Sequence, residues 1–194
     1  MTGSNDGVFG AARTTRRGFL IAAAATAAAS SAAATAPLFG VRPGGVDVLR
    51  VGVVGCGGRG TGAALNALDA HPSVKIVALG DAFAGRLASA RGHLKNAAAE
   101  DPKAYGGRCD VADDKCFVGL DAYRRVIASG IDLVILATPP GFRPDHILAA
   151  AEAGLHVFAE KPVAVDPVGI RKVLKAADVF DAAKTSFVAG TQRR

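Results

Sequence analysis

The chain has 194 residues, half of them hydrophobic, and a formal net charge of +6. The basic residues are spread along the sequence and the aromatic ones are only nine Phe and two Tyr, so no nucleic-acid partner is expected. The three cysteines lack zinc-ligand spacing and imply no disulfide framework, and no metal site is predicted.

Residues 1–36 are expected to form a leader. Residues 15–20 read TRRGFL, which resembles a twin-arginine (Tat) export motif, and an uncharged, alanine-rich segment follows to Ala36. This pattern predicts recognition by the Tat export machinery and a periplasmic or other extracytoplasmic location, with residues 37–47 as a linker. An uncleaved membrane anchor is the alternative, because the segment is just long enough to span a bilayer.

Residues 48–60, VLRVGVVGCGGRG, join an apolar strand to a glycine-rich turn. The β-branched run without polar alternation is typical of a parallel strand buried on both faces. The glycines then have separate predicted roles: Gly55 permits a sharp turn, Gly57 lets a pyrophosphate approach the backbone, and Gly60 allows the next helix to pack on the strand. Arg59 either adds a positive charge at the phosphates or is simply solvated. The spacing predicts a dinucleotide-binding turn.

The remainder of a β-α-β unit follows this turn. Residues 61–70 favour a helix, and residues 74–79 favour a second strand. Asp81 comes directly after that strand, close to the offset of about 20 residues at which an acid binds the adenosine ribose. Asp81 therefore favours NAD over NADP, whereas the nearby Arg86 keeps NADP open.

Further elements are expected along the rest of the chain. The predicted elements are a helix at 84–99, a loop at 101–115, a short strand at 116–118, a helix at 121–129 capped by Asp121, a strand at 131–137, a helix at 144–153, a strand at 156–159, a helix at 166–180 and a strand at 185–189. This alternation predicts an α/β, Rossmann-type fold over residues 48–194, with a doubly wound, mostly parallel sheet and helices on both faces. His146 and His156 are interpreted as structural or surface histidines. Cys109 and Cys116 either form a disulfide or stay free, and Cys56 is given no redox role.

From Leu49 onward the chain resembles the Gfo/Idh/MocA oxidoreductases. The resemblance depends on VGVVGCGGRG at 51–60, on ILATPP at 135–140 followed by His146, and above all on Glu160-Lys161-Pro162, the family's EKP motif. Residues 189–194, AGTQRR, are similar to the segment that leads into the family's substrate domain. Exported members of the family carry twin-arginine leaders.

The resemblance implies NAD as the cofactor and Lys161 as the catalytic residue. Thr138 and Pro139 would form the rim of the nicotinamide pocket, and Glu160 with Lys161 its reacting end. A structural pairing of Lys161 with its neighbour Glu160 is the alternative. The full predicted cofactor-binding set is Gly55, Cys56, Gly57, Gly58, Arg59, Gly60, Asp81, Thr138, Pro139, Glu160 and Lys161.

The resemblance implies that the family's substrate domain would begin where these 194 residues end. We therefore expect the NAD(P)-binding domain of an exported oxidoreductase that acts on the CH–OH group of a sugar or polyol, without useful turnover by these 194 residues alone. No oligomer is expected without the substrate domain. A non-catalytic dinucleotide-binding module and an inactive truncated remnant are the alternative functions.

Overall fold

The computed structural model describes residues 48–191. The predicted leader at 1–36, the predicted linker at 37–47 and the last three residues lie outside the described residues. No helix among the described residues is long and apolar enough to cross a membrane.

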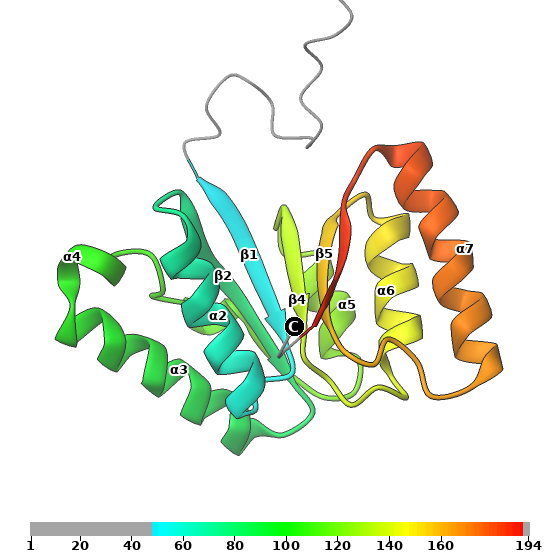
Figure 1. Ribbon diagram of the computed structural model, residues 1–194. Coiled ribbons are helices and arrows are strands. Elements are labelled where there is room, and N and C mark those ends of the chain that lie inside the picture. Colours follow the sequence, from blue (N-terminus) through cyan, green and yellow to red (C-terminus); the bar gives the residue numbers. More distant parts are fainter. Residues whose placement is uncertain (1–47, 192–194) are drawn as a thin grey trace, which may run out of the picture. The chain divides into compact units, whose positions relative to one another are not determined.

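Six parallel strands form one sheet in the order β3-β2-β1-β4-β5-β6 (Figure 1). The strands are β1 (Leu49–Val54), β2 (Val74–Asp81), β3 (Cys116–Val118), β4 (Leu133–Leu136), β5 (His156–Glu160) and β6 (Phe187–Gly190). The chain begins in the middle of the sheet, builds outward to β3, and then returns to the other side of β1. The order therefore reverses between β1 and β4, and in such sheets ligands bind in the crevice at the carboxyl ends of these two strands.

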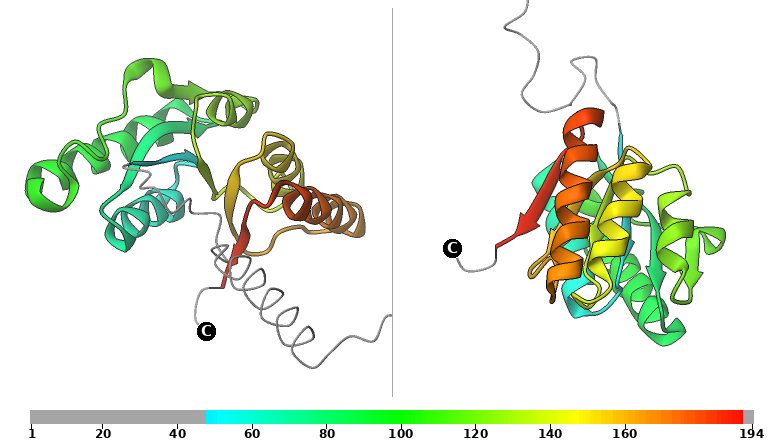
Figure 2. Two further views of the ribbon diagram at one scale, coloured as in Figure 1. Left: turned by 90° about the horizontal axis from the view of Figure 1, so that it is seen from above. Right: turned by 90° about the vertical axis from the view of Figure 1, so that its right-hand side faces the viewer.

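Helices cover both faces of the sheet. The first face carries α2 (Gly58–Ala70) and α3 (Ala84–Glu100), and the second carries α5 (Ala122–Ile127), α6 (Arg143–Glu152) and α7 (Pro167–Ala183). Figure 2 shows α6 and α7 side by side in front of the sheet in its right-hand view. Within β1, Val51 and Val53 pack toward α2 and α3, whereas Val54 packs toward the second face. Both faces of the central strand are buried, and the predicted Rossmann-type fold is confirmed.

Three local expectations were wrong. The first helix begins at Gly58, three residues before the predicted start, because the turn is already complete at Gly57. The predicted loop at 101–115 contains α4 (Pro102–Tyr105), whose first turn is capped by Asp101 accepting from the Ala104 amide at 3.0 Å, and a 3₁₀ turn, η1 (Asp113–Lys115). Asp121 makes no capping hydrogen bond, because its own backbone is helical rather than extended.

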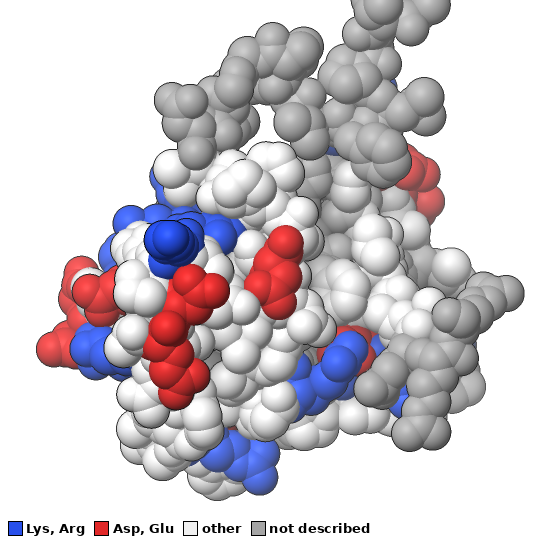
Figure 3. Space-filling model, turned by 60° about the vertical axis from the view of Figure 1, so that its left-hand side comes forward, with Lys and Arg blue, Asp and Glu red and all other residues white. Residues whose placement is uncertain are grey.

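On the face that carries α3 and α4, Lys and Arg side chains are interspersed with Asp and Glu (Figure 3). Cys109 and Cys116 are both free thiols, so the alternative of a disulfide between them is not realised. Among residues 48–191, no group of three or more His, Cys, Asp or Glu side chains is arranged to hold a metal ion.

Candidate functional site

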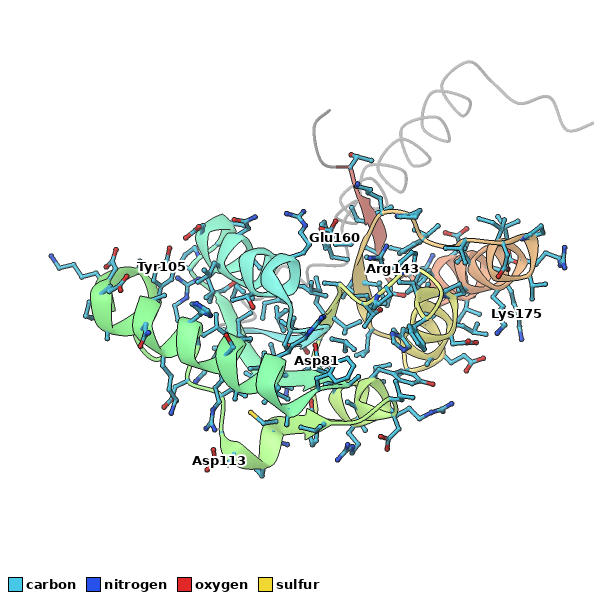
Figure 4. All side chains as sticks on the ribbon, turned by 90° about the horizontal axis from the view of Figure 1, so that it is seen from below. Asp81, Tyr105, Asp113, Arg143, Glu160 and Lys175 are labelled. Carbon is cyan, nitrogen blue, oxygen red and sulfur yellow. The ribbon has the colours of Figure 1, made fainter. Side chains whose placement is uncertain are left out.

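A cavity of about 500 Å³ opens at the carboxyl ends of β1 and β4. Seven of the predicted cofactor residues line it: Gly55, Gly57, Gly58, Arg59, Asp81, Thr138 and Pro139. The other four, Cys56, Gly60, Glu160 and Lys161, do not line the cavity. Figure 4 shows Asp81, Glu160 and Arg143 at this edge of the sheet, whereas Tyr105, Asp113 and Lys175 lie on its periphery.

The glycine turn leaves its inner surface open to the cavity. Gly55 has a φ of +93°, a conformation that side chains disfavour. A Cβ on Gly60 would lie 1.8 Å from the Gly55 carbonyl oxygen, so only glycine lets α2 start this close to β1. A Cβ on Gly57 would instead meet only Arg86 Nη1, at 3.9 Å. The backbone at Gly57 thus has room beside it for a ligand.

The N-terminus of α2 is available to an anion. Its N-cap residue, Gly57, has no side chain, and its first turn contains no acidic residue. The first amides of a helix have no partner within the helix, and the helix dipole places positive charge at the same end. Together with the open surface at Gly57, this end of the cavity fits a pyrophosphate group.

Asp81 holds the glycine turn from the end of β2. Its Oδ2 accepts from the Cys56 amide at 2.7 Å, and its Oδ1 accepts from the Phe83 amide at 2.9 Å. The side chain is buried yet lines the cavity. These two hydrogen bonds fix a negative charge beside the turn, at the position where the Rossmann arrangement requires an acceptor for ribose hydroxyls.

Cys56 contributes through its backbone, not its thiol. Its amide donates to Asp81, and its Sγ donates to the Gly80 carbonyl at 3.4 Å. Burial, followed by the nearby charge of Asp81, raises the pKa of the Cys56 thiol to about 12. The thiol is protonated at neutral pH and is inert as a nucleophile.

Glu160 pairs with Arg59 and not with Lys161. The Glu160 Oε1 lies 2.6 Å from Arg59 Nη2, although the approach lacks hydrogen-bond geometry, so this buried oxygen has an ion pair but no hydrogen bond. Lys161 is exposed and makes no ion pair with any described residue. The structure therefore argues against the alternative in which Lys161 forms a structural ion pair with Glu160.

Arg143 is a site residue that sequence reasoning did not find. It is the first residue of α6, is 5% exposed, and lines the cavity. Its Nη1 donates to the carbonyl oxygens of Glu160 at 2.7 Å and Pro162 at 2.5 Å. No local pattern could have indicated this role, because the two acceptors lie at the end of β5 and in the turn after it, far from Arg143 in the sequence.

His146 is also part of the cavity wall, which the sequence analysis did not anticipate. Its ring stacks on Tyr123 with centroids 4.1 Å apart, and its Nδ1 lies 3.3 Å from Thr138 Oγ1. Burial lowers the pKa of His146 to about 4, so its ring is neutral at physiological pH. His156, in contrast, has a structural role, because its Nδ1 accepts from the Ser186 amide at 3.0 Å.

Comparison with known proteins identifies the family. Residues 49–183 match the model of an oxidoreductase family described as having an NAD-binding Rossmann fold. The chain belongs to the Gfo/Idh/MocA family. The resemblance indicated by the EKP motif is thereby confirmed, and the described residues are the family's NAD-binding Rossmann domain.

Two curated Gfo/Idh/MocA relatives illustrate the range of the similarity. A glycosyl hydrolase family 109 protein of Streptomyces coelicolor is 34% identical over 119 residues, which cover 61% of this chain and 23% of the relative. An inositol 2-dehydrogenase of Rhizobium meliloti is 30% identical over 146 residues, which cover 75% of this chain and 37% of the relative. The chain thus spans well under half of the length of either protein.

Solved Gfo/Idh/MocA structures share the fold. Apo scyllo-inositol dehydrogenase from Lactobacillus casei aligns with a TM-score of 0.57 and 23% identity, over 74% of this chain and 36% of its own. The WlbA dehydrogenase of Chromobacterium violaceum, solved in complex with NADH and UDP-GlcNAcA, aligns with a TM-score of 0.53 and 27% identity, over 76% of this chain and 36% of its own.

Proposed function

We propose that this domain binds NAD for an exported oxidoreductase that removes a hydride from the CH–OH group of a sugar or polyol. The observation that carries the proposal is the uncapped N-terminus of α2 facing the cavity, with Asp81 fixed beside it. The names of the relatives support the substrate class, because three of them are inositol dehydrogenases from different bacteria.

We assign separate roles to the residues in and beside the cavity. The first amides of α2 bind the pyrophosphate, and Asp81 accepts hydrogen bonds from the adenosine ribose. Lys161 is proposed to hydrogen-bond the substrate hydroxyl oxygen and to stabilise the negative charge on that oxygen once its proton has passed to a general base outside these residues, so that the hydride can then leave the carbon. When bound, the nicotinamide ring supplies the hydride acceptor. Thr138, Pro139 and Glu160 are proposed to surround that ring.

The substrate itself is proposed to depend on more than these residues. Hydride transfer needs the reacting atoms held about 3–3.5 Å apart, and this chain matches only 23–37% of the length of the two relatives described above. We therefore expect the 194 residues alone to bind NAD without turnover. Saturable binding would separate this proposal from an inactive remnant, which would bind nothing.

Asp81 is expected to set the preference for NAD. A buried carboxylate repels the 2′-phosphate of NADP, whereas Arg86, whose guanidinium lies 5.5 Å over the Phe83 ring, is the cation available to accommodate it. Titration calorimetry of the full chain should show NAD binding at least roughly tenfold tighter than NADP, about 1.4 kcal/mol. In Asp81→Asn, which removes the charge and keeps the shape, we expect NAD to bind more weakly and the two affinities to converge. A variant that folds and keeps the wild-type ratio would refute the role of Asp81.

Export is a separate part of the proposal, supported by the TRRGFL motif at 15–20. A double substitution of Arg16 and Arg17 by lysine keeps the charge and removes the arginine pair. In a bacterial host with an active Tat pathway, the wild-type chain should appear in the periplasmic fraction and the variant should remain in the cytoplasm, measured by immunoblot of both fractions. Equal periplasmic amounts of the two proteins would count against Tat export.

A glycosidase reaction is the second candidate. It is favoured by the 34% identity to the family 109 glycosyl hydrolase of Streptomyces coelicolor, whose match covers part of the same domain. The two candidates differ in the net reaction. An oxidoreductase accumulates NADH in proportion to product, whereas a hydrolase releases a sugar without net change in NAD.

A further inference from the structure

We propose that Arg143 is a positioning residue for Lys161, which fixes the backbone on both sides of this lysine and so sets the position from which its exposed side chain reaches a substrate. The inference depends on the proposed function, because it assigns a purpose to Arg143 within the same site. Neither the EKP motif nor the glycine turn includes this arginine.

The geometry places Arg143 around Lys161 without touching its side chain. The two carbonyls that accept from Arg143 Nη1 belong to Glu160 and Pro162, the residues directly before and after Lys161. One nitrogen atom at the start of α6 thus ties down both ends of a turn that follows β5. Because Arg143 also lines the cavity, it connects the wall of the dinucleotide site to the EKP segment (Figure 4).

The burial of Arg143 is energetically unfavourable and needs a compensating role. Its Nε is fully buried without a hydrogen-bond partner. Desolvation lowers the pKa of the guanidinium, and the neighbouring charge of Glu160 opposes this effect. Apolar side chains often replace buried charges without loss of stability, so simple filling of the space does not account for an arginine here. The two carbonyl contacts do account for it.

A second arginine restrains the same segment from the other side. Arg59, in the first turn of α2, holds the carboxylate of Glu160, while Arg143 holds the backbone. Of the two charged residues in the EKP segment, Glu160 is buried and paired with Arg59, whereas Lys161 is exposed and has no ion pair to a described residue. The two arginines leave the Lys161 ammonium free to bind a ligand, and they hold in place the backbone from which its side chain extends.

The test compares two probes on the full chain. ADP-ribose carries the adenosine and pyrophosphate but no nicotinamide, whereas NADH carries all three. Arg143→Met removes the donors and keeps the length of the side chain, Arg143→Lys keeps one charged donor, and Arg171→Met is the matched control, because Arg171 is exposed on α7 and does not line the cavity. Thermal melting establishes that each variant folds, and calorimetry and NADH fluorescence measure binding.

We expect Arg143→Met to weaken NADH binding at least fivefold and to lose the fluorescence change of the bound nicotinamide, while ADP-ribose affinity stays within about twofold. Arg143→Lys should restore part of the NADH affinity, and Arg171→Met should match the wild type. If Arg143→Met does not fold, the ratio of NADH to ADP-ribose affinity is measured on Arg143→Lys instead, and it should be lower than in the wild type. A folded variant with the wild-type ratio of NADH to ADP-ribose affinity would overturn the inference alone. Failure of the proposed function looks different, because the wild-type chain then binds neither probe, and the inference falls with it.

Discussion

Gly57→Val is expected to abolish NAD binding while the domain stays folded. A Cβ at this position has only Arg86 Nη1 within 4 Å, at 3.9 Å, so the protein itself tolerates the side chain. The Gly57 backbone has φ −72° and ψ −179°, which β-branched residues adopt readily. The valine methyl groups would instead occupy the cavity at the N-terminus of α2, where the pyrophosphate is proposed to lie. We expect affinity to fall at least roughly 100-fold, about 2.7 kcal/mol.

Calorimetry with NAD, together with a thermal melt of each protein, checks this expectation. Gly62→Ala is the matched control, because residue 62 lies further along α2, its added Cβ meets no atom within 4 Å, and it does not line the cavity. It should bind NAD as the wild type does. Gly60→Ala, in contrast to Gly57→Val, should lower the stability of the fold, since its Cβ would overlap the Gly55 carbonyl oxygen. Tight NAD binding by folded Gly57→Val would remove the pyrophosphate from this end of the cavity.

The second large effect is a loss of stability in mild acid caused by His146. The folded-state pKa of His146 is lowered from 6.5 to about 4, first by burial, while Asp145 opposes the shift and Arg124 adds to it. Between these two values the unfolded chain binds more protons than the folded one, so stability rises with pH. The contribution is fully present above pH 6.5 and is lost as the pH falls through 4. Between pH 7 and pH 4.5 it amounts to about 2 kcal/mol.

Urea unfolding of wild type and His146→Gln at several pH values from 7 to 4.5 isolates this effect. Carboxylates also titrate in acid, so the informative quantity is the difference between the two proteins in the pH dependence of their unfolding free energy. We expect the wild type to lose about 2 kcal/mol more than His146→Gln over this range. Parallel profiles would mean that His146 is not held neutral in the fold. NMR titration of the histidine ring offers a direct second reading of its pKa.

Much of the fold follows from short stretches of sequence. The apolar run before Gly55 and the run at 74–79 lie in strands β1 and β2, and the run at 131–137 contains the shorter strand β4 (Leu133–Leu136). Such continuous apolar runs are typical of strands that are buried on both faces of a parallel sheet. The sequence predicted less well the short polar segments that can form either a loop or a single helical turn. Residues 102–105 form one helical turn where a loop was expected, since a single Asp101 cap suffices to begin it.

In the candidate site, too, some features could be predicted from the sequence and others could not. The glycine spacing and the acid after β2 could be predicted from the sequence. A turn in which the backbone passes this close to a carbonyl oxygen has no room for a side chain, so it requires glycine. The partners of Asp81 were not readable: its hydrogen bond to the Cys56 amide joins the ends of two different strands. The wall formed by His146 and Tyr123 likewise brings together two helices that are separate in the sequence.

The EKP segment shows the division most clearly. Together with the glycine turn and residues 135–140, its three letters indicated the family, since the type and order of residues can be read without knowledge of the fold. They also suggested that Glu160 and Lys161, adjacent in sequence, could pair with each other. In the fold Glu160 lies against Arg59 from the glycine turn, and Arg143 from α6 binds the carbonyls on either side of Lys161. Charges and donors pair by their separation in space, and parallel strands bring distant segments to one edge of a sheet, so these contacts exist only once the sheet is assembled.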